Sequence, residues 1–308
     1  MNAPHIPVLL AEVKEAFKHI EEGYIIDCTL GYGGHSEALL EAHPNITLVG
    51  CDQDEEALAF SAKRLERFKE RVILEHENFS TVIAKYANLP IRGILADIGV
   101  SSLQLDKKER GFAFDSDVLD MRMNPNNALS AYEVINHYPK AELELIFREF
   151  GEIHEYKKMA QVICEAREKE PITSAKHLSS LVEKLSSKKK IHPSTLLFQA
   201  IRIEVNNELG VLNALLESIK EAHFESCIVA IISFHSLEDR IVKQTFKWWS
   251  QKCICPPAVM RCHCGNNNAL GKIITKKPIE VRTSEMKKNP RSRSAKLRLF
   301  NLRGNDAR

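Results

Sequence analysis

Residues 24–35 read Tyr-Ile-Ile-Asp-Cys-Thr-Leu-Gly-Tyr-Gly-Gly-His, an apolar run that ends at Asp27 and is followed by a glycine-rich turn. This order is typical of the first strand, turn and helix of a parallel α/β sheet, because glycines let the chain reverse tightly from strand to helix. The turn also lets a ligand approach the backbone, and the helix after it offers free N–H groups. A glycine turn alone can also be purely structural. The residues around it must therefore show whether this turn binds a ligand.

Apolar runs follow this turn at regular intervals. Residues 46–52, 71–74 and 91–97 have the character of further strands, and stretches with helical spacing separate them. Residues 226–234 form the most strand-like run of the chain, and residues 296–302 alternate in the manner of a last strand. Because strands that alternate with helices are typical of a parallel sheet with crossover helices, the sequence predicts an α/β fold with a Rossmann-like sheet.

The pattern changes after Ser102. Residues 105–205 contain no convincing strand and hold amphipathic runs separated by turns rich in Pro, Gly and Lys. An inserted helical domain explains this change. We therefore expect a sheet domain made of residues 1–104 and 206–308, the latter with a basic C-terminal tail, around an inserted helical domain of residues 105–205.

Composition and charge exclude several classes of protein. The 308 residues are 44% hydrophobic and 27% charged, the balance of a soluble globular protein. No run approaches the roughly 20 apolar residues of a membrane span. The N-terminus has neither the basic nor the apolar region of a secretory signal. We expect a cytoplasmic protein without a membrane partner, and the sequence does not indicate its oligomeric state.

Positive charge is concentrated near the C-terminus. The formal net charge is only +2, yet residues 276–308 hold eleven Lys or Arg against three acidic residues. Such a segment can contact the phosphates of a nucleic acid. A solvated terminal segment explains the same charge equally well.

Three carboxylates stand at the ends of predicted strands, namely Asp27, Asp52 and Asp97. The carboxyl ends of parallel strands meet at one edge of a sheet, where open α/β folds bind ligands. Asp52 follows the turn by about 20 residues, the place from which an acid accepts ribose hydroxyls. A dinucleotide site would need a third glycine, but Ser36 follows His35. Helix capping could explain each acid singly, whereas three acids beside a glycine turn favour a nucleoside site.

Two further segments carry polar residues that a core does not need. His235 follows the run 226–234 directly, so it falls at the same sheet edge and is a candidate catalytic residue, although a histidine there is more often structural. In the helical stretch 192–206, Gln199, Arg202 and Asn206 share a face that could reach a substrate.

Eight cysteines in a chain of this length do not indicate a secreted disulfide scaffold. Four of them, Cys253, Cys255, Cys262 and Cys264, form two Cys-x-Cys pairs in one short segment. Such a cluster is interpreted first as a metal site or as redox-sensitive thiols. Because the two pairs are closer together than in common zinc sites, the sequence assigns no metal to them.

Taken together, these residues resemble the bacterial 16S rRNA cytosine-N4 methyltransferases, which modify a cytidine in the decoding region of the small ribosomal subunit. The resemblance extends nearly from end to end, and several motifs in the same order make it specific. The motifs are residues 5–13, 27–36, 97–104, 110–112, 119–123, 192–209, 234–240 and 289–298.

The resemblance implies a class I S-adenosylmethionine methyltransferase domain with an inserted helical domain for substrate recognition. It implies S-adenosyl-L-methionine as the cofactor and 16S rRNA, within the small ribosomal subunit, as the partner. Only the resemblance assigns a role to Phe79, as an aromatic residue that packs against adenine. The implied cofactor contacts are Gly33, Gly34, His35, Asp52, Phe79, Asp97 and Gln104.

Methylation of an exocyclic amine needs in-line alignment of the nitrogen with the donated methyl group, and a group that accepts the proton. Asp97 is the first candidate for that acceptor and His235 the second, while Asp97 could instead hold the methionine part of the cofactor. A methyltransferase acting on DNA or protein is one alternative, although the Asn/Asp-Pro-Pro-aromatic tetrapeptide of DNA amino-methylases is missing at Asp97. A non-catalytic RNA-binding factor with the same pocket is the other.

Overall fold

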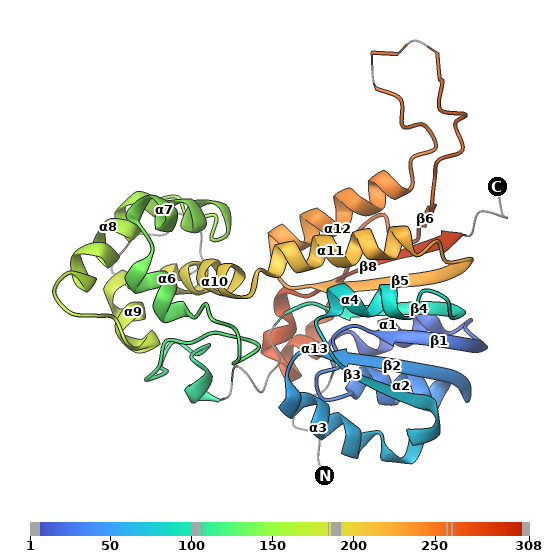
Figure 1. Ribbon diagram of the computed structural model, residues 1–308, viewed down its shortest axis with the longest axis horizontal. Helices are drawn as coiled ribbons and strands as arrows, with labels where there is room; N and C mark the ends of the chain where they lie inside the picture. The colour runs from blue at the N-terminus through green and yellow to red at the C-terminus, as the bar shows by residue number, and fades with distance from the viewer. Residues whose placement is uncertain are drawn as a thin grey trace. The chain divides into compact units, whose positions relative to one another are not determined.

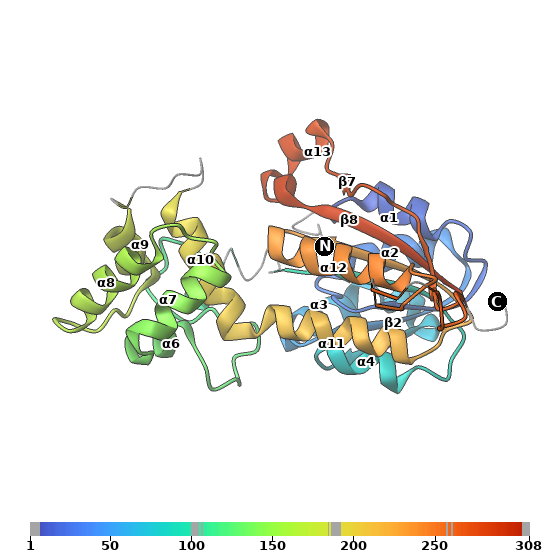
Figure 2. The ribbon, with the colours of Figure 1, turned by 90° about the horizontal axis from the view of Figure 1, so that it is seen from above.

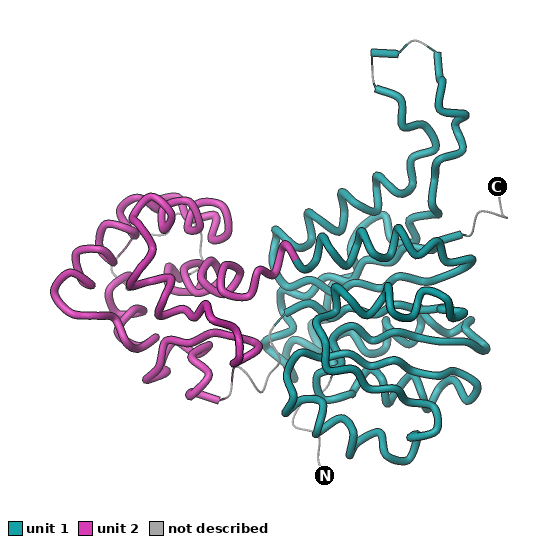
Figure 3. The backbone as a smooth tube through the Cα atoms, viewed as in Figure 1, with its two compact units in different colours: residues 1–99, 211–308 teal, residues 100–210 magenta. Residues whose placement is uncertain are grey.

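The computed structural model describes residues 7–99, 105, 107–183, 185, 192–256, 258–259 and 261–303. The chain divides into two compact units, drawn in different colours in Figure 3. Unit 1 contains residues 1–99 and 211–308, and unit 2 contains residues 100–210. No helix within the described residues combines the length and the apolar character needed to cross a bilayer.

Unit 1 is built on one sheet with the strand order β3-β2-β1-β4-β5-β8-β6, and β7 pairs with β8. Neighbours among β1 to β5 are parallel, whereas β8 runs antiparallel to β5, β6 and β7. The strands are β1 (Glu22–Asp27), β2 (Asn45–Asp52), β3 (Val72–His76), β4 (Ile91–Asp97), β5 (Ser226–Ser233), β6 (Gly271–Ile273), β7 (Ile279–Glu280) and β8 (Lys296–Arg303).

Helices cover both faces of this sheet, as Figures 1 and 2 show. Successive strand residues point to opposite faces, so Ile26 packs in the core beneath α4, α11 and α12, and Ile25 packs in the core beneath α1 and α2. A mixed sheet that is parallel from β3 to β5 and covered by helices on both faces confirms the predicted Rossmann-like fold of class I methyltransferases. The helices are α1 (Leu10–Phe17), α2 (Gly34–Ala42), α3 (Glu55–Arg64), η1 (Glu66–Arg71), α4 (Phe79–Lys85), α11 (Glu208–Glu221), α12 (Ser236–Trp249), α13 (Thr283–Lys288) and η3 (Pro290–Ser294).

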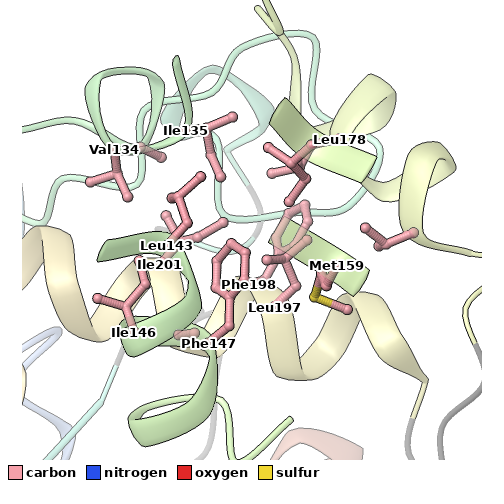
Figure 4. Packing of buried hydrophobic residues seen from close by; sticks show 14 of the residues in the cluster. Val134, Ile135, Leu143, Ile146, Phe147, Met159, Leu178, Leu197, Phe198 and Ile201 are labelled. Atoms are coloured by element: carbon pink, nitrogen blue, oxygen red, sulfur yellow. The ribbon is translucent and has the colours of Figure 1, made fainter. Parts of the chain in front are cut away.

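The regular secondary structure in the described residues of unit 2 is helical, and these residues contain no strand. Its helices enclose a separate hydrophobic core, in which Phe147, Leu197 and Ile201 are fully buried (Figure 4). Because this core is its own, unit 2 has the packing of an independent domain. The helices are η2 (Lys108–Arg110), α6 (Ala131–His137), α7 (Lys140–Glu149), α8 (Tyr156–Arg167), α9 (Ala175–Val182) and α10 (Pro193–Asn206).

Asn206 joins α10 to an irregular segment of unit 2. Its side chain accepts a hydrogen bond from the Met123 N–H at 2.7 Å and donates one to the Met121 carbonyl oxygen at 2.8 Å. Met121 is buried and has a positive φ of 59°, a conformation that costs energy for a residue with a side chain. The Asn206 amide therefore holds this strained segment in place.

We expect Asn206→Ala to lower the free energy of unfolding by about 1–3 kcal/mol, because it removes both hydrogen bonds from Asn206 to this partly buried segment. Urea denaturation of the whole chain measures the loss. Asn126→Ala, at an exposed position of the same unit, is the control and should change stability by about 0.5 kcal/mol at most. Equal stability of the two variants would show that Asn206 does not hold the segment.

The basic C-terminal segment is folded from β7 to β8, and its cations divide between buried and exposed positions. Arg298 on β8 is 7% exposed and forms a two-point ion pair with Asp239 of α12, at 2.7 and 3.0 Å. Other cations of the segment point outward and can meet a partner. The exposed ones are Lys276, Lys277, Arg282, Lys287, Lys288, Arg291, Arg293 and Arg303.

Candidate active site

The glycine turn begins where β1 ends and leads directly into α2. Gly31 and Gly33 have φ angles of 51° and 70°, in the left-handed region that glycine adopts without strain. The Gly33 N–H donates to the Leu30 carbonyl oxygen at 2.7 Å, which closes the turn. No side chain in the described part of the chain caps α2, so the N–H groups of its first turn remain available to a ligand.

Side chains beneath the turn hold it in shape. Asp27 is 1% exposed and accepts hydrogen bonds from the Ser36 hydroxyl at 2.6 Å and the Thr29 N–H at 3.2 Å. Burial raises the pKa of Asp27 to about 6. The Ser61 hydroxyl of α3 donates to the Gly31 carbonyl oxygen at 2.6 Å. Asp27 therefore supports the turn from inside and does not line an open crevice, contrary to the expectation from its strand-end position.

Asp52 ties the turn to the end of β2. Its two carboxylate oxygens accept the Gly31 N–H at 2.8 Å and the Asp54 N–H at 2.9 Å. Burial raises the pKa of Asp52 to about 6. Each carboxylate oxygen has a second lone pair, so Asp52 can still accept hydroxyl groups from a ligand at the turn.

Asp97 ends β4, two strands away from Asp52 across the sheet. Its backbone N–H donates to the Thr29 hydroxyl at 2.7 Å, and its Oδ2 lies 4.0 Å from Nδ1 of His35. Its Oδ1 is buried and has no hydrogen-bond partner among the described residues. Burial raises the pKa of Asp97 to about 6. A buried acceptor without a donor is costly in the free protein, so this oxygen suits a ligand that brings an N–H or O–H group.

His35 is held by the chain segment that precedes α1. Its Nε2 donates to the Val8 carbonyl oxygen at 2.9 Å, and the ring is almost fully buried. The neighbouring Leu9 N–H donates to a carboxylate oxygen of Glu285 on α13, at 2.9 Å. Residues 8 and 9 thus connect the glycine turn with the basic segment around α13.

Phe79 is the first residue of α4, directly after β3 and at the same sheet edge. The Asn78 side chain caps this helix by accepting the Ser80 N–H at 3.1 Å, and it donates to the Gln53 side chain at 3.3 Å. These contacts join the ends of β2 and β3. Phe79 is half-buried and packs against the core that contains Ile26.

His235 has a structural role at the start of α12. Its Nδ1 accepts the Glu238 N–H at 3.5 Å, and the Glu238 carboxylate accepts the N–H groups of Phe234 and His235 at 2.8 and 3.2 Å. This reciprocal arrangement is a capping box. The His235 Nε2 lies 3.0 Å from the other Glu238 oxygen, and the side chain is 6% exposed. His235 therefore caps α12 through Nδ1, and its Nε2 lies against Glu238 without forming a hydrogen bond to it.

The remaining candidate residues fall into two groups. Gln104 lies outside the described residues, as do the other motif residues at 100–103. Within unit 2, Gln199 donates to the Phe150 carbonyl oxygen at 2.9 Å, and Arg202 makes a two-point ion pair with Glu208 at 2.7 and 2.9 Å. Together with Asn206, these side chains stabilise unit 2 through the contacts described, and their proposed reach toward a substrate stays a prediction.

Thr29 and Ser61 were not anticipated from the sequence. Thr29 lies within residues 24–35, but only its hydrogen bond to the Asp97 backbone shows that it joins the turn to β4. Ser61 is an ordinary residue of α3 in the sequence, and nothing there indicates that it anchors Gly31 across thirty positions.

Comparison with known proteins gives long matches. The profile of the MraW methylase family matches residues 2–303. Ribosomal RNA small subunit methyltransferase H of Aliarcobacter butzleri is 61% identical over 97% of this chain and 99% of its own. The namesakes from Wolinella succinogenes and Sulfurovum are 57% and 55% identical, each over 98% of this chain and at least 99% of their own. A solved structure of a putative methyltransferase from Streptococcus mutans, in complex with SAH, matches with a TM-score of 0.39 at 12% identity, covering 97% of this chain and 99% of its own.

Proposed function

Because the chain belongs to the MraW methylase family, we propose that it transfers a methyl group from S-adenosylmethionine to N4 of a cytidine in the decoding region of 16S rRNA. The substrate class follows from relatives, named for the small ribosomal subunit, that align over nearly the whole chain. Methylation of an amine is supported by one observation. The buried Oδ1 of Asp97 has no hydrogen-bond donor within the described residues. Such a substrate places the protein in the cytoplasm.

The residues of the turn fit the cofactor. The uncapped start of α2 offers the backbone N–H groups of Gly34 and His35, with Gly33 making the close approach possible. Asp52 would accept the ribose hydroxyls, and Phe79 would pack against the adenine ring. Gln104 completes the proposed contacts. When bound, S-adenosylmethionine supplies an electrophilic methyl group.

Asp97 would act on the amine that receives the methyl group. The lone pair of the cytosine N4 is delocalised into the ring, so the nitrogen must be oriented toward the donated methyl carbon. A hydrogen bond from an N4–H to Asp97 Oδ1 provides this orientation. As the new N–C bond forms, that proton passes to the carboxylate, which acts as the general base.

The RNA must reach this site with its target base unstacked, because an N4 amine inside a helix is not accessible to the pocket. The exposed cations of residues 276–293 supply phosphate contacts. A chain of contacts connects this basic segment with the glycine turn and supports this role. Glu285 of α13 accepts the Leu9 N–H, and the neighbouring Val8 carbonyl oxygen holds His35. Unit 2 would provide further contacts to the folded rRNA of the small subunit.

Mass spectrometry of 16S rRNA from cells that lack this protein tests the proposal. We expect N4-methylcytidine in the decoding region to be lost and to return when the wild-type gene is restored. Persistence of the modification would contradict the proposed substrate. Its return with a protein that cannot bind S-adenosylmethionine would favour the non-catalytic RNA-binding alternative.

The capping role of His235 gives a separate prediction. We expect His235→Asn to keep the turnover within about tenfold of the wild type, because asparagine caps helices well and Asp97 accepts the proton. His235→Ala should lower the stability by about 1 kcal/mol through loss of the cap. Methyl transfer to purified small subunits measures the first effect and thermal denaturation the second. A loss of about 100-fold or more in turnover with His235→Asn would identify His235 as the proton acceptor.

A further inference from the structure

A long excursion of the chain between α12 and β6 protrudes from unit 1 (Figure 1). It carries Cys253 and Cys255 on its outgoing part and Cys262 and Cys264 on its returning part. We refer to residues 250–270 as the arm. At its base the Asn268 N–H and side chain donate to the Lys252 carbonyl oxygen at 3.0 and 3.1 Å, and the side chain also donates to the Cys264 carbonyl oxygen at 3.0 Å.

The arm has no hydrophobic core to stabilise it. None of its described residues is buried, and Ile254 and Val259 are 51% and 37% exposed. Short segments without a core are commonly held by a metal ion or by disulfides. The conformation of the arm therefore calls for a cross-link.

The four sulfur atoms converge at one point of the arm. All of them lie within 4.8 Å of one another. Cys253 Sγ is 3.7 Å from the sulfurs of Cys262 and Cys264, which are 3.4 Å apart. A disulfide requires about 2.05 Å. A tetrahedron of thiolates with Zn–S bonds of about 2.3 Å has edges of about 3.8 Å, so these spacings match zinc coordination.

Backbone donors complete the arrangement with an approximate twofold symmetry. The Ile254 N–H, between the first two cysteines, donates to Cys264 Sγ at 3.4 Å. The His263 N–H, between the other two, donates to Cys255 Sγ at 3.3 Å. Each pair thus supplies an N–H to the second cysteine of the other pair. Such donors stabilise thiolates bound to a metal, in the way outer-shell hydrogen bonds support metal ligands generally.

We propose that Cys253, Cys255, Cys262 and Cys264 bind one Zn²⁺ ion as a tetrahedral four-thiolate site. The site is closed, with no coordination position left for a substrate, so the ion is structural. It cross-links the two parts of the arm, and it lies outside the proposed methyl-transfer site. Metal binding should therefore govern the order of the arm and leave the cofactor site intact.

Elemental analysis of the full-length protein, purified under reducing conditions without a chelator, tests this assignment. We expect about one zinc per chain. Replacement by Co²⁺ should give the intense visible absorption of a tetrahedral cobalt thiolate. Cys253→Ser and Cys262→Ser should each lose the metal, and S-adenosylmethionine binding by each variant checks that unit 1 remains folded.

His263→Ala is the matched control, because it changes a side chain between two ligands and keeps the backbone donor. It should retain the metal. Removal of zinc by a chelator should speed tryptic cleavage at the exposed Lys252 and Arg261 in the wild-type protein. A reduced protein that carries no zinc and takes up none from added ZnCl₂ would overturn the proposal. Loss of zinc in His263→Ala would overturn the four-thiolate ligand set.

Discussion

Asp97→Asn is expected to lower the rate of methyl transfer to small ribosomal subunits by about 10²–10⁴-fold, the range attributable to a general base. Asparagine keeps the size of the side chain and an acceptor oxygen at the end of β4. It cannot take the proton that leaves N4. The backbone bond from residue 97 to Thr29 is unaffected by the substitution, so the fold of unit 1 should be preserved.

The pH dependence of the rate provides a second readout of the same residue. Burial raises the pKa of Asp97 to about 6, so the carboxylate that accepts a proton prevails only above that pH. We expect kcat/KM of the wild type to rise about tenfold per pH unit below pH 6 and to level off above about pH 7. The Asn variant should lack this rise. Radiolabelled methyl transfer across this pH range measures both profiles.

Binding of S-adenosylmethionine separates the two roles that are open to Asp97. A proton acceptor lowers turnover on mutation and leaves the dissociation constant of the cofactor within about tenfold. A residue that holds the methionine part of the cofactor would instead weaken binding, as measured by calorimetry. Undiminished turnover in Asp97→Asn would exclude the proton-acceptor role, and an unchanged dissociation constant would exclude the cofactor-holding role.

The sequence predicts the strands of unit 1 better than their arrangement. The apolar runs at β1, β2, β4 and β5 are clear, because strands buried on both faces are apolar throughout. The alternating run at β8 is also predicted, but its position between β5 and β6 and its antiparallel direction are not. A hydrophobic pattern specifies which face of a strand is buried and contains no information about its neighbour.

For the site, the sequence indicates the strand-end carboxylates and cannot distinguish their roles. Asp27 and Asp97 occupy equivalent places in the pattern. One is satisfied by Ser36 and Thr29, whereas the other keeps a buried oxygen without a described partner. The difference depends on donors brought together by folding. The same limit applies to the cysteines, whose close spacing in sequence argued against zinc although their sulfurs converge in space.

Asp52→Ala is expected to raise the dissociation constant of S-adenosylmethionine by about 100-fold or more, equivalent to about 2.7 kcal/mol. The loss has two physical sources. Asp52 is proposed to accept the ribose hydroxyls, and a hydrogen bond to a charged group contributes about 1.5–3 kcal/mol. Its carboxylate also holds the Gly31 N–H, so the alanine variant loosens the turn that contacts the rest of the cofactor.

Calorimetric titration of three variants resolves these two sources. Asp52→Asn keeps one acceptor oxygen and should bind with an affinity between those of the wild type and Asp52→Ala. Glu55→Ala changes an exposed acid in the first turn of α3 and controls for loss of negative charge nearby, so its affinity should stay within about twofold of the wild type. If Asp52→Ala bound the cofactor as tightly as Glu55→Ala does, the ribose contact and the support of Gly31 would both be excluded as determinants of affinity. The cofactor would then depend on the start of α2 and on the other proposed contacts, Phe79, Asp97 and Gln104.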